Sequence, residues 1–146
     1  MVKVFAIDFD GTCVTDDFPL VGKDIGAAPV LRELVANGHK LVLHTLRADI
    51  DESRDIPGCV RCAPGKYLQD AVDWFEREGI PLFGVNSRPD VPCPSPKLMS
   101  DISIDDRNAG TPLIQLKGGD GHRPYVDWRA MRSHLAAMGF IAPGGR

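Results

Sequence analysis

The chain has 146 residues, of which 43% are hydrophobic and 25% charged, and a formal net charge of −3. This length and composition are typical of one globular domain over residues 1–146, and the slight negative charge argues against a general affinity for the nucleic-acid backbone. No apolar run approaches the roughly 20 residues of a membrane span, no signal-peptide pattern begins the chain, and four cysteines are too few for a disulfide scaffold, so we expect a cytoplasmic protein that does not bind membranes.

The first half of the chain predicts two strands with a helix between them. Residues 2–9 are apolar and β-branched, which favours a buried strand that ends in acidic residues. After a polar loop, the apolar spacing over 30–35 predicts a helix that Gly38 ends. Residues 40–45 predict a second strand, and the charged, irregular segment 47–64 is expected to be an inserted loop that contains a CxxC pair.

The second half continues the alternation. Its expected elements are a helix with apolar positions from Leu68 to Phe75 that ends at Gly79, a strand over 82–85, a proline-rich irregular segment over 87–96, a strand over 101–105, a short fifth strand over 111–116, and a helix from Trp128 to Met138 stopped by Gly139. Alternating strands and helices are typical of βαβ units. The sequence therefore predicts an α/β fold, a Rossmann-like three-layer parallel sheet covered on both faces.

Polar side chains follow four of the predicted strands. They are Asp8 and Asp10, then Thr45, then Asn86, then Asp105 and Asp106. Ligands of parallel sheets bind beyond the carboxyl ends of the strands, so these groups should meet at one rim. Four carboxylates this close resist ionising together unless a cation lies between them. Oxygen ligands without a histidine partner favour Mg²⁺, which we expect as the cofactor.

A metal-bound carboxylate beside a second carboxylate suits phosphoryl transfer. One carboxylate attacks phosphorus and forms an aspartyl phosphate, and the other manages protons. Thr45 offers a hydroxyl and a backbone N–H to the transferred group, and Lys97 offers a positive charge just before the fourth strand. These residues favour a phosphohydrolase that forms an aspartyl phosphate on one of the clustered carboxylates.

The same residues resemble the four motifs of the haloacid dehalogenase (HAD) superfamily, in that family's order. The motifs are Asp8-Phe9-Asp10-Gly11-Thr12, Thr45 after an apolar strand, Lys97, and Asp105-Asp106. The resemblance covers roughly residues 2–108 and implies a magnesium-dependent phosphate monoester hydrolase with a HAD-like core. Members that break carbon–halogen bonds usually lack the second aspartate of the first motif, which is present here as Asp10.

The resemblance also implies a role for each site residue. Asp8 would be the nucleophile and a magnesium ligand. Asp10 would protonate the leaving oxygen and then activate water, while its backbone carbonyl contacts the metal. Thr45 would bind the phosphoryl oxygens, and Lys97 would stabilise the nucleophile and the developing charge.

The sequence departs from the family pattern in two places. The resemblance implies that Asp106 is the main acidic metal ligand with Asp105 beside it. The fourth motif reads Asp-Ile-Ser-Ile-Asp-Asp-Arg-Asn, however, and not Gly-Asp followed by a later Asp, so the choice between them stays open. Segment 47–64 is longer than the tight connection expected after the second motif.

The spacing of the motifs leaves no room for a cap domain. In the family a cap is inserted after the first motif or between the second and third, and here loops, helices and strands fill both intervals. The resemblance therefore implies a capless member with an open site. Such a site could take a small phosphorylated molecule, a nucleotide, a nucleic-acid end or a phosphoprotein, or be covered by a second subunit of a homo-oligomer.

Several residues allow a second interpretation. Cys59, Cys62 and Cys93, with His44, could hold a structural zinc ion, although one CxxC pair is weak evidence and reduced thiols are the default. Arg47 lies two residues after Thr45 and either reaches a substrate phosphate or is an ordinary surface arginine.

Two other function classes fit part of the pattern. A signalling receiver module also joins acidic residues, a threonine and a lysine on a parallel sheet, but its phosphorylated aspartate follows the third strand, where this chain has Val85-Asn86-Ser87. A catalytically silent binding protein of the same fold is the other alternative, against which the four intact motifs argue.

Overall fold

The computed structural model describes residues 1–52, 63–92, 94–115 and 123–144. Its elements in chain order are β1 (Val4–Ile7), α1 (Ala27–Ala36), β2 (Lys40–Leu43), β3 (Asp49–Ile50), β4 (Gly65–Lys66), α2 (Tyr67–Arg77), β5 (Gly84–Val85), β6 (Ile102–Ile104), β7 (Leu113–Ile114), β8 (Tyr125–Val126) and α3 (Trp128–Ala137). No helix in these ranges is long and apolar enough to cross a membrane.

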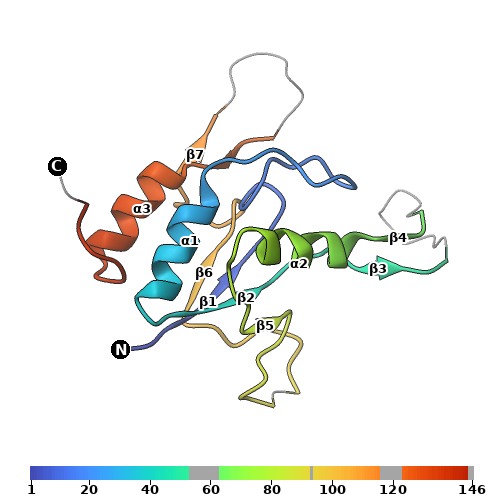
Figure 1. Ribbon diagram of the computed structural model, residues 1–146, viewed down its shortest axis with the longest axis horizontal. Coiled ribbons are helices and arrows are strands. Elements are labelled where there is room, and N and C mark those ends of the chain that lie inside the picture. Colours follow the sequence, from blue (N-terminus) through green and yellow to red (C-terminus); the bar gives the residue numbers. More distant parts are fainter. Residues whose placement is uncertain (53–62, 93, 116–122, 145–146) are drawn as a thin grey trace.

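A four-stranded parallel sheet in the order β5-β2-β1-β6 forms the centre of the fold (Figure 1). In its register, Phe5 on β1 lies opposite Leu41 on β2 and Ile102 on β6. The connections β1-α1-β2 and β2-α2-β5 both move one strand toward the β5 edge of the sheet. Because such connections are right-handed, α1 and α2 lie on the same face of the sheet. The sheet with its flanking helices confirms the predicted Rossmann-like α/β fold, and the described residues contain no cap domain.

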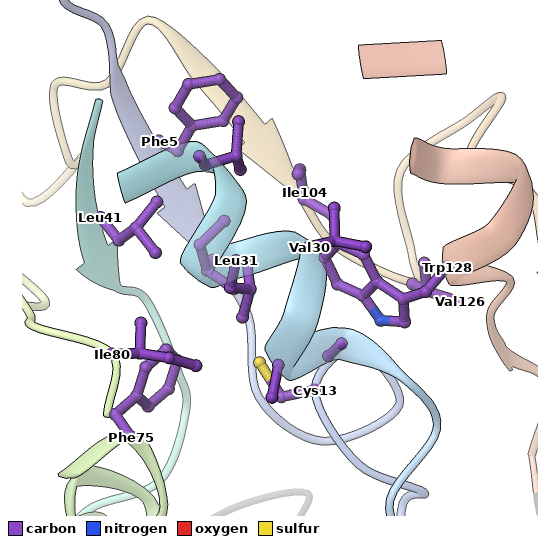
Figure 2. Packing of buried hydrophobic residues seen from close by; sticks show 14 of the residues in the cluster. Phe5, Cys13, Val30, Leu31, Leu41, Phe75, Ile80, Ile104, Val126 and Trp128 are labelled. Carbon is purple, nitrogen blue, oxygen red and sulfur yellow. The ribbon is translucent and has the colours of Figure 1, made fainter. Parts of the chain in front are cut away.

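The main hydrophobic core lies between this face of the sheet and the helices. Buried strand residues on the face are Phe5, Ile7, Leu41, Leu43 and Ile104, and the helices add Leu31, Leu34, Phe75, Trp128 and Leu135 to the same cluster (Figure 2). Val4, Ala6 and Val42 point to the opposite face and are also buried, so both faces of the central strands are covered. Burying each large apolar side chain stabilises the fold by about 1.5–3 kcal/mol, which keeps the strand ends in place.

The helix ends follow the signals expected from the sequence. Gly38, Gly79 and Gly139 follow α1, α2 and α3 and have φ angles of 86°, 66° and 80°. Glycine adopts this left-handed backbone without the steric cost that a Cβ brings, so it ends a helix readily. At the other end of α3, the Asp127 side chain accepts hydrogen bonds from the backbone N–H groups of Arg129 and Ala130, both at 3.0 Å.

Four short strands differ from the sequence expectation. The fifth strand, expected over 111–116, is present as β7 but lies outside the parallel sheet, because it pairs antiparallel with β8. The expected loop 47–64 contains β3, which pairs with β4 just beyond it. The strand β8 also contacts the loop after β1, since the Val126 N–H donates to the Gly11 carbonyl at 2.9 Å.

Candidate metal centre

Three carboxylates lie together at the carboxyl ends of two neighbouring strands. Asp8 follows β1, and Asp105 and Asp106 follow β6. The Asp8 N–H donates to the Ile104 carbonyl at 3.0 Å, so the pairing of the two strands continues to the start of this cluster. One carboxylate oxygen of each residue lies within 4.8 Å of the other two. The sequence prediction that strand ends would bring these three side chains together is confirmed.

Thr12 connects the two halves of this acidic cluster. Its buried hydroxyl donates to Asp8 Oδ2 at 2.9 Å and accepts the backbone N–H of Asp106 at 3.0 Å. The indole N–H of Trp128 donates to the Thr12 carbonyl at 2.6 Å and so attaches α3 to the same loop. The sequence marked Thr12 only as part of the first motif, and this bridging role became visible only with the structure.

The three carboxylates of the cluster carry like charges that repel one another. The pKa of Asp8 is raised to about 7, mainly by burial and in part by the charges of Asp105 and Asp106, against the lowering effect of the Thr12 hydrogen bond. Burial, followed by the charge of Asp105, also raises the pKa of Asp106. Half-buried oxygen donors that repel each other are the ligand set that a hard divalent cation prefers, so the residues present fit Mg²⁺.

Gly11 leaves the space that the Asp106 carboxylate occupies. Its φ angle is +80°, and a Cβ at this position would lie 2.7 Å from Asp106 Oδ2. Gly38 has a similar φ angle of +86° with nothing within 4 Å of the added Cβ, so it is a matched control.

Gly11→Ala is therefore expected to destabilise the protein more than Gly38→Ala. Gly38→Ala should cost about 1–2 kcal/mol for the left-handed backbone alone, and Gly11→Ala about 1–3 kcal/mol more because the Asp106 side chain has to move. Urea denaturation of both variants measures the difference. Equal losses would show that the Asp106 side chain moves aside without cost.

The fourth predicted carboxylate, Asp10, lies in an ion pair with Arg47. Arg47 Nε and Nη2 donate to Asp10 Oδ2 and Oδ1, both at 2.7 Å. The expectation of four clustered carboxylates is thus met by three, because the side chain of Asp10 is directed to Arg47. Arg47 itself is buried, so of the two alternatives for this residue the ordinary surface arginine is wrong.

Thr45 and Lys97 have different surroundings. The Thr45 N–H donates to Asn86 Oδ1 at 2.9 Å, and its hydroxyl accepts the Arg47 N–H at 3.1 Å. Lys97 is exposed and lines, with Asn86, a cavity of about 240 Å³. Within the described ranges no hydrogen bond or ion pair joins Lys97 to the acidic cluster, so the structure connects Thr45 to Asp10 through Arg47 but does not bring Lys97 to Asp8.

The cysteines of the zinc hypothesis, Cys59, Cys62 and Cys93, lie outside the described residues. His44, the other residue of that hypothesis, is exposed. Cys13 is buried beside the acidic cluster, and its thiol donates to the Asp8 carbonyl at 3.2 Å. Burial and then the charge of Asp8 raise the pKa of the Cys13 thiol, which keeps it protonated.

Comparison with known proteins gives one informative match. No family model matches the chain, and no curated protein matches it. Among solved structures, the chain is similar to a conserved protein from Bacteroides thetaiotaomicron, with a TM-score of 0.68 and 26% sequence identity over 94% of this chain and 93% of that one. The two proteins therefore share their architecture over nearly their full lengths.

Proposed function

We propose that the chain is a magnesium-dependent phosphate monoester hydrolase of the haloacid dehalogenase superfamily, acting through an aspartyl phosphate on Asp8. The observation that carries the proposal is the cluster of Asp8, Asp105 and Asp106 carboxylates within 4.8 Å at the ends of β1 and β6. This is the edge at which parallel sheets bind ligands. The order of the motifs in the sequence supports the same assignment.

The proposed reaction has two steps. An Asp8 oxygen attacks phosphorus and forms a new P–O bond while the bond to the leaving oxygen breaks, and Asp10 gives that oxygen its proton. Water then attacks the phosphorus, Asp10 takes a proton from the water, and the bond to Asp8 breaks to release inorganic phosphate. Thr45 donates to the phosphoryl oxygens, and the positive charge that the resemblance assigns to Lys97 stays a prediction of the sequence.

Asp8, Asp105 and Asp106 would hold the magnesium ion in this proposal. Bound Mg²⁺ would supply positive charge opposite the carboxylates and the phosphoryl oxygens. Since burial raises the pKa of Asp8 to about 7, a nearby cation would also favour the carboxylate form that acts as the nucleophile. A cytoplasmic location and a possible homo-oligomer stay predictions of the sequence.

Phosphate release from a panel of monoesters tests this function. The panel contains p-nitrophenyl phosphate, an alkyl phosphate, a sugar phosphate, 5′- and 3′-mononucleotides and a 3′-phosphorylated oligonucleotide, each with Mg²⁺ or with EDTA. We expect turnover that requires Mg²⁺, and the ranking of the esters then gives the substrate class. Turnover that is equal in EDTA would contradict the metal assignment, and no turnover on any ester would favour the catalytically silent protein.

A further inference from the structure

We propose that Arg47 is a positioning residue that holds the Asp10 carboxylate for the proton transfers of the reaction. This inference rests on the proposed function and goes beyond it, because it assigns a role to a buried residue outside the four motifs. Arg47 Nε and Nη2 donate hydrogen bonds to the two carboxylate oxygens of Asp10, each at 2.7 Å. A two-point contact of this kind fixes the orientation of a carboxylate as well as its position.

Every N–H donor of the Arg47 guanidinium has a partner. Besides the two donors on Asp10, Nη2 donates to the Leu20 carbonyl at 2.7 Å. Nη1 donates to the carbonyls of Pro19 and Tyr67 at 3.4 and 3.3 Å. A guanidinium has five N–H donors, and these contacts use all of them. Arg47 therefore has no donor left for a substrate phosphate, which argues for a role through Asp10.

Two aromatic rings contact the guanidinium of Arg47. Its carbon lies 5.1 Å from the ring centre of Phe9 and 5.2 Å from that of Phe18. The Arg47 side chain is 1% exposed, whereas the Asp10 side chain is 18% exposed. Arg47 is thus the buried member of the pair, and the Asp10 carboxylate is the member that reaches solvent at the rim. Each Asp10 oxygen can accept one more hydrogen bond, so the carboxylate can still exchange a proton there.

Arg47 also ties Asp10 to the predicted phosphate-binding residue. Its backbone N–H donates to the Thr45 hydroxyl at 3.1 Å, two residues earlier in the chain. One residue therefore sets the position of Thr45 through its backbone and the position of Asp10 through its side chain. Loss of the guanidinium should disturb proton transfer to the leaving oxygen, which matters most for esters whose leaving group is a poor one.

The test compares two substrates in Arg47→Lys, Asp10→Asn and the double variant. The substrates are p-nitrophenyl phosphate, which needs little protonation of its leaving group, and the best alkyl phosphate of the panel, which needs it strongly. The readout is kcat/KM, which covers the steps up to departure of the leaving group. We expect Arg47→Lys to lower it roughly 10–100-fold for the alkyl ester and about threefold or less for p-nitrophenyl phosphate. In the Asp10→Asn background, Arg47→Lys should cause no further loss.

Arg132→Lys is the matched control, since Arg132 forms a similar two-point pair with Glu33, at 2.9 and 2.6 Å, between α1 and α3. It should leave both rates unchanged. Equal losses on the two esters, or losses that add in the double variant, would overturn the inference and leave Arg47 a structural tie. A wild-type protein without turnover would instead refute the proposed function, and the inference with it.

A second variant covers the case in which Arg47→Lys does not fold. Phe18 is 48% exposed, and its ring contacts the Arg47 guanidinium, so Phe18→Leu loosens the arginine without removing a core residue. We expect a smaller loss, about 3–10-fold, again selective for the alkyl ester. A loss without this selectivity in Phe18→Leu would also overturn the inference.

Discussion

Replacing Asp8 with Asn is expected to abolish phosphate release and, in the metal-free protein at pH 8, to raise the free energy of unfolding. An amide cannot form the aspartyl phosphate, so kcat should fall roughly 10⁴-fold or more. The gain in stability has a separate cause. Burial raises the pKa of Asp8 to about 7, which means that the folded protein resists carrying a charge there, and Asn has no charge.

The sign of the pH dependence follows from the same shift. The folded protein holds a proton on Asp8 more tightly than the unfolded chain, in which the carboxyl titrates near 3.8. The resulting stabilisation is fully present below about pH 4 and is lost as the pH rises to about 7. The Asp8 carboxyl should therefore lower the free energy of unfolding of the wild type by up to about 4 kcal/mol across this window, and Asp8→Asn should keep only the part of the fall that comes from Asp106.

Urea denaturation at pH 4, 6 and 8 in EDTA measures this difference. Asp101→Asn is the matched control, because Asp101 lies just before β6, at the opposite end of that strand from Asp105. Its Oδ2 accepts the Val4 N–H at 2.7 Å, and an amide oxygen can still do so. Adding Mg²⁺ at pH 8 should stabilise the wild type by mass action and Asp8→Asn much less. The same pH slope in wild type and Asp8→Asn would contradict the prediction.

The acidic cluster could be predicted because its residues follow apolar strands. Asp8 and the Asp105-Asp106 pair each end a short buried run, and the carboxyl ends of parallel strands meet at one edge. The sequence alone does not indicate that β1 and β6 are neighbours, because β1 is the first and β6 the last strand of this sheet in chain order. The prediction needed only that both strands belong to the same parallel sheet.

The position of Arg47 could not be predicted, because nothing local marks an arginine as buried. Its partners lie up to 37 residues away and include three backbone carbonyls that leave no trace in the sequence. The strand β8 was missed for a related reason, because a strand of two residues is too short to show an alternation of apolar and polar side chains. Lys97 lies in a proline-rich segment whose path follows neither helical nor strand periodicity, so its distance from Asp8 could not be inferred.

Two features combine to make Arg47 costly to remove. A buried ion pair that loses one partner leaves the other charge uncompensated, which typically costs about 3–5 kcal/mol. The loss would also remove the Arg47 N–H donors from the carbonyls of Pro19, Leu20 and Tyr67.

Arg47→Met should accordingly lower the free energy of unfolding by about 3–5 kcal/mol at pH 7. Arg132→Met, which breaks the pair with Glu33 in which the two side chains are 32% and 28% exposed, should cost about 1 kcal/mol or less. Urea denaturation of both variants gives the comparison. Combining Arg47→Met with Asp10→Asn should recover part of the loss, because the uncompensated carboxylate is then gone. No recovery in the double variant would mean that the backbone carbonyls, rather than Asp10, account for the stability that Arg47 provides.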